Sequence, residues 1–519
     1  MSTPNLYNIL SKKLEQKRKD HPSFRLMEID DRLFPNAQTK YSTLVLEARD
    51  SKDKLKTVKE IVVESWEKGD KNHLMIEGEG GIGKTVTLLS IPDKFTPFPV
   101  PAIYIPLHEL PKGDDPIEGY IKKKVLNNRE DLYVQLLDLL DNPWDKGPRL
   151  LLLLDGFNEI AAENRQTISE DIEHWSEFSG IQVVTSSRYD IHTYVELSYD
   201  YSTIKLQPLS DRTVKKYLNS ADVSIPVDNA VKKLITIPLL LTLYVKTEHI
   251  QKQRETDSSE FREAKNAGSI VWNYLQCELR LFGKENQDAK NAIIAMEFIA
   301  PYMAWQMQQK SLFVLDKKEF HKFLNHAYTL LENHFNKPDD FPFQIKDVLQ
   351  KADGIPPLET IRNLLEKHLC LFVKSGNSYK LMHQQFRGAL AAIHLINSIY
   401  LNGNSRPKEW NSTVDHYVMQ FVADLISEKE AIRMWEQNRN TKPAIDNATR
   451  NQLQLQGLLH DNDFSHLDFS GIDLSNISMY LYRANNTQLR LPTDSNKLKK
   501  TILAERTFKS LGNLLSSCT

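Results

Sequence analysis

The feature that most constrains this chain is a glycine-rich loop pattern at residues 78–85. The segment GEGGIGKT matches G-x-x-x-x-G-K-[ST], in which glycines let the backbone wrap around a polyphosphate and turn its N–H groups inward. The apolar run at 73–76 predicts a buried strand before the loop, and residues 84–91 predict a helix that Pro92 stops. The candidate binding residues are Gly78, Glu79, Gly80, Gly81, Ile82, Gly83, Lys84 and Thr85. The sequence therefore predicts binding of a nucleoside triphosphate.

Two side chains of the loop suit the charges of such a ligand. Lys84 is expected to reach the β- and γ-phosphates, and the Thr85 hydroxyl is expected to hold Mg²⁺. The N-terminus of the following helix adds a partial positive charge. The predicted cofactors are ATP or ADP with Mg²⁺.

Composition limits the remaining classes. At 519 residues the chain exceeds one domain, and its length predicts about three or four. With 40% hydrophobic and 26% charged residues and a net charge of −2, it lacks the basic excess of a nucleic-acid or anionic-membrane binder. Its apolar runs are too short to span a bilayer, and the N-terminus lacks a signal-peptide core. We expect a cytoplasmic protein.

Strand and helix patterns alternate between residues 73 and 206, which predicts a parallel sheet covered on both faces. The expected fold class is an α/β P-loop NTPase core with a parallel five-stranded sheet. A small helical domain, a winged-helix domain and a short C-terminal helical and pentapeptide-like region are expected to follow. The expected strands are His73–Glu77, Val100–Leu107, Arg149–Leu154, Ile181–Ser186 and Thr203–Leu206.

After Pro208 the pattern becomes mostly helical, with one exception. Residues 369–373 and 379–382 flank a glycine-containing turn and predict a β-hairpin between helices at 358–368 and 384–400. Helices with one hairpin are typical of a winged-helix module. The expected domains are 1–50, 51–208 (NTPase core), 209–285 (small helical), 286–400 (winged helix) and 401–519 (sensor or partner region).

The two ends of the chain carry further patterns. Residues 1–22 predict a helix with leucines on one side and a basic other side, which is either a solvated face or a docking helix. Residues 24–48 are expected to be irregular, and 55–68 predict an amphipathic helix. Residues 462–481 resemble pentapeptide repeats, but one coil cannot bury its apolar face alone. Of the three cysteines, Cys277 and Cys370 are expected to be buried thiols.

A second candidate motif is RLLLLLDGFNE at residues 149–159. Five leucines predict a strand buried on both faces, and Asp155 falls at its carboxyl end, where open α/β sheets bind ligands. Asp155 is expected to hold Mg²⁺ and to neutralise phosphate charge. Glu159 can polarise an attacking water from the same cleft.

A third motif, VVTSSR at residues 183–188, is another strand that ends in polar side chains. Its Arg188 can contact the terminal phosphate through charge-assisted hydrogen bonds and so detect whether that phosphate is present. The predicted catalytic residues are thus Lys84, Asp155, Glu159 and Arg188.

These motifs, with IPLLLTL at 237–243, make residues 50–400 resemble the NACHT family of STAND nucleotidases, which are switch ATPases. The resemblance implies that Pro238 lies against the adenine. It also implies that His383, in the segment YKLMHQQF, holds the β-phosphate of ADP and locks a resting state. Two positions depart from the family pattern: Asn158 replaces an acid, which argues against fast turnover, and Ile237-Pro238 replaces Asn-Pro.

The resemblance implies a slow ATPase that acts as a switch and oligomerises on activation, in bacterial innate immunity against phage. Its trigger is unknown; a phage-derived protein and a host chaperone are both open. Two alternatives remain: a STAND-type DNA-binding regulator, and a P-loop ATPase with a non-immune role. DNA binding is disfavoured because the candidate recognition helix, residues 384–400, carries Arg387 as its only strong cation and is otherwise largely apolar, so that it is expected to be buried.

Overall fold

The chain is described by a computed structural model and divides into two compact units, Met1–Thr256 and Asp257–Thr519. Each unit is considered by itself. The structure describes residues 3–21, 47–49, 55–67, 73–94, 100–111, 113–141, 149–191, 195, 201–253, 262–280, 287–335, 342–350, 354–369, 371–375, 378–381, 383–401, 407–438 and 447–460. The pentapeptide-like segment 462–481, Cys370 and Cys518 lie outside these residues. No described helix is long and apolar enough to cross a membrane.

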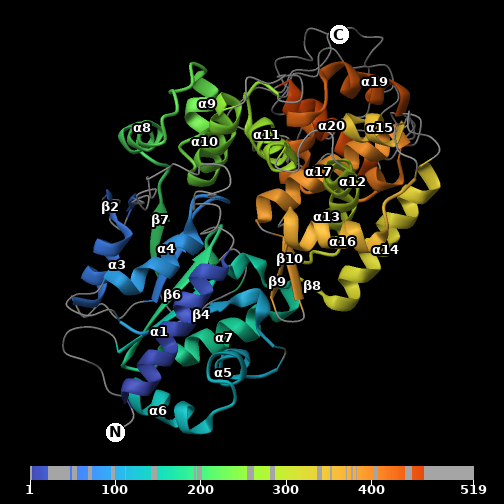
Figure 1. The fold of residues 1–519 in the computed structure, drawn as a ribbon. Helices are drawn as coiled ribbons and strands as arrows, with labels where there is room; N and C mark the ends of the chain where they lie inside the picture. Colours follow the sequence, from blue (N-terminus) through green and yellow to red (C-terminus); the bar gives the residue numbers. More distant parts are fainter. Residues whose placement is uncertain are drawn as a thin grey trace, which may run out of the picture. The chain divides into compact units, whose positions relative to one another are not determined.

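The first unit is built on a mixed sheet of the order β2-β1-β7-β3-β6-β5-β4 (Figure 1). Five strands of this sheet pair in parallel, as the sequence predicts. They are β3 (His73–Glu77), β4 (Ala102–Pro106), β5 (Leu150–Asp155), β6 (Ile181–Ser187) and β7 (Tyr201–Leu206). Because β6 lies between β3 and β5, it brings the phosphate-loop strand close to the strand that ends in Asp155.

The prediction of a five-stranded sheet is incomplete, because two short antiparallel strands extend it. Strands β1 (Glu47–Arg49) and β2 (Leu55–Thr57) pair with each other, and β1 also pairs with β7. Their three residues each are too few for a recognisable alternation of apolar and polar side chains. The helix expected from residue 55 therefore begins later, as α3 (Val58–Glu67).

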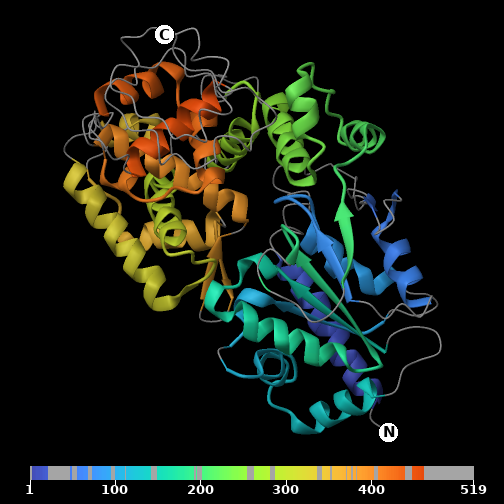
Figure 2. The ribbon, with the colours of Figure 1, turned by 180° about the vertical axis from the view of Figure 1, so that it is seen from behind.

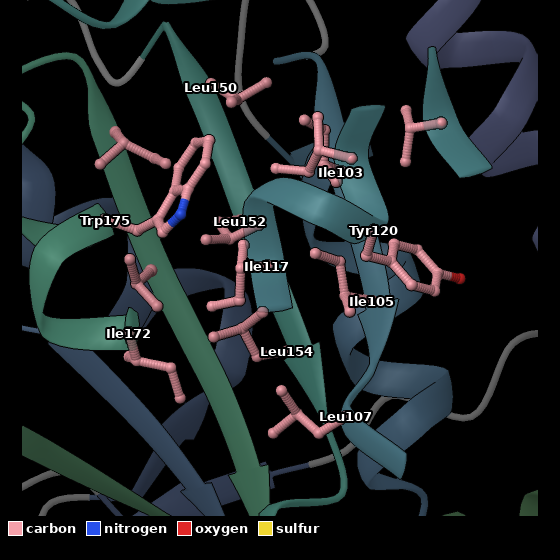
Figure 3. Close-up of a cluster of buried hydrophobic side chains, with 14 of the residues drawn as sticks. Ile103, Ile105, Leu107, Ile117, Tyr120, Leu150, Leu152, Leu154, Ile172 and Trp175 are labelled. Atoms are coloured by element: carbon pink, nitrogen blue, oxygen red, sulfur yellow. The ribbon is translucent and has the colours of Figure 1, made fainter. Parts of the chain in front are cut away.

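Apolar clusters cover both faces of the central strands. Along β5, alternate leucines belong to the two clusters: Leu150, Leu152 and Leu154 to one, Leu151 and Leu153 to the other. Side chains of α5 (Pro116–Tyr120), α6 (Glu130–Leu140) and α7 (Arg165–Ser176) contribute to the first cluster. Figure 2 shows the ribbon of these helices from behind, in the colours of residues 116–176. Figure 3 shows the β4 and β5 side chains of this cluster together with Ile117, Ile172 and Trp175.

The opposite face is covered by α3 and by the helix that follows the loop, α4 (Lys84–Ser90). Full burial of an aliphatic side chain contributes about 1.5–3 kcal/mol. The buried leucines therefore stabilise β5 within the sheet and fix the position of Asp155 at its end.

The N-terminal helix α1 (Thr3–Asp20) packs on the edge strand β4. Leu6 and Leu10 join the first cluster and Leu14 joins the second, so the helix spans both sides of that edge. Two of its cations also bind the unit: Lys13 donates to the Lys124 carbonyl at 3.2 Å, and Lys17 donates to the Tyr120 hydroxyl at 3.2 Å. The basic side of α1 is therefore in large part docked on its own domain rather than solvated.

Arg18 links α1 to the helix behind the phosphate loop. Its guanidinium donates through Nε at 2.8 Å, and through a second nitrogen, to the carbonyl of Leu89 in the last turn of α4. It also pairs with Asp93 at 3.0 Å. A cation at this position is favourable because the last carbonyls of a helix lack intrahelical partners and carry partial negative charge.

Three helices follow β7 in the first unit: α8 (Asp211–Ser220), α9 (Asn229–Leu234) and α10 (Pro238–Gln253). Ser210 and Asp228 cap the first two by accepting backbone N–H groups of the first turns. Shorter turns also connect the elements of this unit: η1 (Ile91–Lys94), η2 (Leu107–Glu109), η3 (Ile121–Val125), η4 (Phe157–Glu159) and η5 (Ala162–Asn164).

The second unit is helical around α17 (Gln384–Leu401), which packs on α13 (Ala300–Gln309) and α18 (His416–Leu425). The expected hairpin is present as β9 (Phe372–Ser375) and β10 (Ser378–Leu381), and β8 (Leu315–Asp316) extends it. The helix before the hairpin is α16 (Leu358–Asn363), continued by η10 (Leu364–His368). Cys277 is buried, as expected.

The remaining elements of this unit complete the helical packing. They are α11 (Ala267–Arg280), α12 (Gln287–Ile294), η8 (Ala295–Ile299), α14 (Lys317–His334), α15 (Phe343–Gln350), η11 (Lys408–Asn411), α19 (Glu428–Asn438) and α20 (Asn447–Leu459).

Replacing Arg18 tests the docking of α1. Arg18→Ala removes a charge-assisted hydrogen bond to the Leu89 carbonyl. We therefore expect the free energy of unfolding of the first unit to fall by about 1–2 kcal/mol. The neighbouring Lys19 is the matched control, since its pair with Glu15 is exposed. Lys19→Ala should stay within about 0.5 kcal/mol of wild type in the same denaturant titration. Equal effects of the two substitutions would show that α1 is not held through Arg18.

Candidate functional site

The phosphate loop runs from the end of β3 to the start of α4, at the carboxyl edge of the parallel strands. Gly81 and Gly83 have φ of 81° and 100°, a left-handed conformation that favours glycine. Gly78 has no space for a side chain, because a Cβ there would lie 2.8 Å from Ile82 Cγ2. The backbone path of the loop therefore favours glycine at Gly81 and Gly83, and the close approach of Ile82 favours it at Gly78.

The Lys84 ammonium is folded onto the loop itself. It donates to the carbonyls of Gly78 at 2.6 Å and Glu79 at 2.9 Å. Burial, reinforced by the charge of Arg188, lowers the pKa of Lys84 to about 8. The partly buried ammonium is still mostly protonated at pH 7, and an anionic ligand at the loop would stabilise its charged form further.

Asp155 lies where the sequence places it and gathers three hydroxyl groups. Its Oδ2 accepts hydrogen bonds from Thr85 at 2.7 Å and from Tyr104 at 2.8 Å, and its Oδ1 accepts one from Ser186. Burial and the nearby Asp155 charge hold the pKa of Tyr104 well above its usual value, so that the phenol remains a donor. Thr85 and Asp155, the two residues expected to hold Mg²⁺, are therefore in direct contact.

Glu159 follows Asp155 through a tight turn. Gly156 adopts φ 82°, the Glu159 N–H donates to the Gly156 carbonyl at 2.8 Å, and a Cβ at Gly156 would lie 3.1 Å from the Glu159 carboxylate. The Glu159 Oε2 lies 3.3 Å from Nδ1 of His108. His108, on η2 beyond β4, is thus a neighbour of the candidate base that the sequence analysis did not identify.

Arg188 and Asn158 join the ends of two adjacent strands. The backbone N–H of Arg188, just beyond β6, donates to Asn158 Oδ1 at 3.1 Å. The influence of Arg188 on the pKa of Lys84 places its charge near the loop. Asn158, the departure from the family pattern, therefore has a structural role in tying the β5 turn to β6.

Pro238 begins α10 beside the phosphate loop. The next residue, Leu239, donates its N–H to the carbonyl of Gly81 at 3.2 Å. The Thr242 hydroxyl donates to the Pro238 carbonyl at 2.9 Å. The helical segment after the sheet is thus bonded directly to the loop, at a position adjacent to Pro238. The contact of Pro238 with adenine stays a prediction.

His383 belongs to the second unit and caps α17. Its Nδ1 accepts the backbone N–H of Gln385 at 3.1 Å, and its carbonyl accepts the N–H of Phe386 at 3.0 Å. This contact gives His383 a local structural role, and its role toward ADP stays a prediction.

The oxygen donors at the loop suit Mg²⁺ only in part. A hydroxyl and a carboxylate are ligands that Mg²⁺ prefers, and Thr85 and Asp155 bring them within 2.7 Å. In the described part of the chain no group of three or more His, Cys, Asp or Glu side chains could hold a metal ion. The protein thus offers a partial site that the phosphates of a nucleotide would have to complete, as is usual for Mg²⁺.

Tyr104 and Ser186, like His108, are site residues that sequence reasoning missed. Tyr104 lies inside an apolar strand, where a tyrosine is typical of the core. Ser186 lies in the polar end of β6, where the sequence analysis gave a role only to Arg188. Their place at the site follows from the order of the strands, because β4 and β6 flank β5 and hold these residues beside Asp155.

Comparisons with known proteins find no matching family model and no matching curated protein. Among solved structures, Cdc6p from Pyrobaculum aerophilum is similar at 12% identity, with 72% of this chain and 98% of that chain covered and a TM-score of 0.28. The Aeropyrum pernix ORC1 protein in complex with DNA matches at 11% identity over 70% of this chain and 95% of that chain, with a TM-score of 0.30. Domain III of the Thermotoga maritima replication initiation protein DnaA matches at 15% identity, over 41% and 88%, with a TM-score of 0.26.

At these TM-scores the likenesses carry no argument about function. The fold class follows instead from the chain's own features: parallel strands, a glycine loop between β3 and α4, and a carboxylate at the end of β5. Together they define a P-loop nucleotide-binding fold.

The lowered pKa of Lys84 predicts a pH dependence of nucleotide binding. Anionic phosphates stabilise the charged ammonium, so above pH 8 binding must take up a proton. Between pH 8 and the higher pKa that Lys84 has in the ADP complex, the dissociation constant for ADP should therefore rise by roughly tenfold per pH unit. Calorimetry between pH 7.5 and 9.5 measures this. Lys84→Arg, which stays charged, should show a flat profile; a flat wild-type profile would contradict the assignment.

Proposed function

We propose that this chain is an ATP-binding molecular switch of the NACHT type within the STAND nucleotidases, and that it hydrolyses ATP slowly. The observation that carries the proposal is the convergence of Lys84, Thr85, Asp155 and Glu159 at the carboxyl edge of one sheet, with α10 bonded to the same loop. Lys84 supplies a phosphate contact, Thr85 and Asp155 supply the metal contacts, and Glu159 supplies a base. The helix supplies a mechanical connection.

The chemistry proposed for hydrolysis follows from these side chains. Lys84 leaves the loop carbonyls to contact the β- and γ-phosphates, and Arg188 contacts the terminal phosphate. Thr85 and Asp155 would hold Mg²⁺ together with the phosphates, and the ion would neutralise phosphate charge. Glu159 orients and deprotonates the attacking water. Its Oε2 lies 3.3 Å from Nδ1 of His108. Slow turnover is proposed because Asn158 stands where the family pattern has an acid.

The connection to the rest of the chain is proposed to run through α10. A ligand that reshapes residues 78–83 changes the acceptor that Leu239 uses, so α10 senses the loop directly. A conformational equilibrium shifts only if the two nucleotides make different contacts in its two states. Arg188, which contacts only the terminal phosphate, and His383, proposed to hold ADP, supply that difference.

The domain roles rest on the family resemblance. Residues 209–285 are proposed as the small helical domain, 286–400 as the winged-helix domain and 401–519 as the region that receives a trigger. Activation is proposed to produce a self-oligomer in the cytoplasm, in bacterial defence against phage. The trigger is proposed to be a phage-derived protein or a host chaperone.

A DNA-binding regulator is disfavoured by the packing of α17. Every residue from 385 to 399 is buried, so this helix lacks a surface for a DNA groove in the second unit as it stands. Its Arg387 donates to the Leu312 carbonyl at 2.8 Å and stacks over Phe313. A P-loop motor or kinase would differ in kinetics, since it turns over briskly without a trigger.

A phage challenge tests the proposed function. Bacteria that express the wild-type chain should resist at least one phage of a diverse panel, and Lys84→Ala should remove that protection, because nucleotide binding is lost. Lys215→Ala, an exposed substitution on α8, is the control for expression and folding. Protection that survives Lys84→Ala, or none against any phage, would contradict the proposed defence role.

Substitution of His383 separates its capping role from a latch. His383→Ala should produce trigger-independent growth arrest or ATP turnover, since the resting state loses a contact with ADP. His383→Asn can still cap α17 through a short polar side chain but lacks the imidazole. We expect both variants to be active without a trigger. If only the alanine variant changes, or if neither does while nucleotide content is normal, the latch role is wrong.

A further inference from the structure

We propose that Tyr104 is a positioning residue for the Mg²⁺ site: its hydroxyl fixes the Asp155 carboxylate beside Thr85 and thereby sets the affinity for Mg²⁺-bound nucleotide. The inference rests on the proposed nucleotide binding and adds a residue to it. Tyr104 is not part of the loop or of the leucine strand that carries Asp155. It comes from the neighbouring edge strand β4.

The geometry of the sheet places Tyr104 at the carboxylate. Strands β4 and β5 pair in parallel, with Pro106 opposite Asp155 and Tyr104 two residues earlier on β4. The side chain of Tyr104 belongs to the cluster on the α4 face of the sheet and is 6% exposed. Its hydroxyl reaches Asp155 Oδ2 at 2.8 Å, on the same oxygen that accepts from Thr85.

The other carboxylate oxygen is held by a separate chain of donors. The backbone N–H of Gly156 donates to Ser186 Oγ at 2.9 Å, and the Ser186 hydroxyl donates to Asp155 Oδ1. With Ser186 on one oxygen and Tyr104 on the other, the plane of the carboxylate is set from both neighbouring strands. Of the three hydroxyl groups, only that of Thr85 is a candidate metal ligand. Tyr104 and Ser186 can therefore hold Asp155 in place while Thr85 binds the metal.

A purely structural explanation makes a different prediction. A buried tyrosine hydroxyl needs a hydrogen-bond partner, and Asp155 could serve only that need. In that case, loss of the hydroxyl would change stability but leave the dependence of nucleotide binding on Mg²⁺ unaltered. When a group that hydrogen-bonds to a metal ligand is removed, the affinity for the metal typically falls by about 10–100-fold.

The test is the Mg²⁺ dependence of binding of a fluorescent ADP analogue to the full chain. In Tyr104→Phe, which removes only the hydroxyl, the Mg²⁺ concentration for half-maximal enhancement of affinity should rise about tenfold. Binding in excess EDTA should equal wild type, because Lys84 and the loop are unchanged. Tyr120→Phe is the control: its hydroxyl also donates to a carboxylate, Glu109 at 3.2 Å, away from Asp155.

The outcomes separate the inference from the proposed function. If wild type binds no ADP, or binds it with no effect of Mg²⁺, the proposed site itself fails. If wild type responds to Mg²⁺ and Tyr104→Phe responds equally, the positioning role is overturned. Should Tyr104→Phe unfold, Ser186→Ala supplies the second variant: a raised Mg²⁺ requirement supports fixing of Asp155 from the adjacent strands, and an unchanged one contradicts it.

Discussion

The structure depends on how one carboxylate is held at the end of a fully buried strand. Five leucines fix β5 between β4 and β6, and each flanking strand contributes a hydroxyl group to Asp155. The third hydroxyl comes from Thr85, so the same carboxylate joins the sheet to the phosphate loop. Because even a partly buried carboxylate is costly unless it is hydrogen-bonded, this arrangement couples the packing of the core to the shape of the site.

Two helices extend that coupling beyond the site. At one end of α4, the loop carbonyl of Gly81 accepts from α10; at the other, Arg18 of α1 binds the carbonyl of Leu89. A ligand that displaces Lys84 from its loop carbonyls therefore acts on an element held at both ends. This is the physical basis for proposing a switch: the loop and α4 are bonded to segments that lie far from them in the sequence, and we propose that these bonds transmit a change in the loop.

Much of this site could be predicted from residue pattern, and the exceptions have physical causes. The leucine run, the loop glycines and the positions of Asp155 and Glu159 follow from local sequence, because each depends on one strand and the turn after it. Tyr104, Ser186 and His108 could not be found in that way, since their roles arise from the order of the strands. The docking of α1 was equally hidden: Arg18 meets Leu89 across 71 residues of sequence. The three-residue strands β1 and β2 carry no periodic signal at all.

The most direct test of the central claim is calorimetric titration of the nucleotide-stripped chain with a slowly hydrolysed ATP analogue, with and without Mg²⁺. Thr85→Val, which keeps the size of the side chain but removes its hydroxyl, is the decisive comparison. The account predicts one nucleotide bound per wild-type chain, tighter binding with Mg²⁺, and loss of that Mg²⁺ effect in Thr85→Val. Binding by Thr85→Val with an unchanged Mg²⁺ effect would contradict it, because the loop and Asp155 would then not form the metal-binding part of the site.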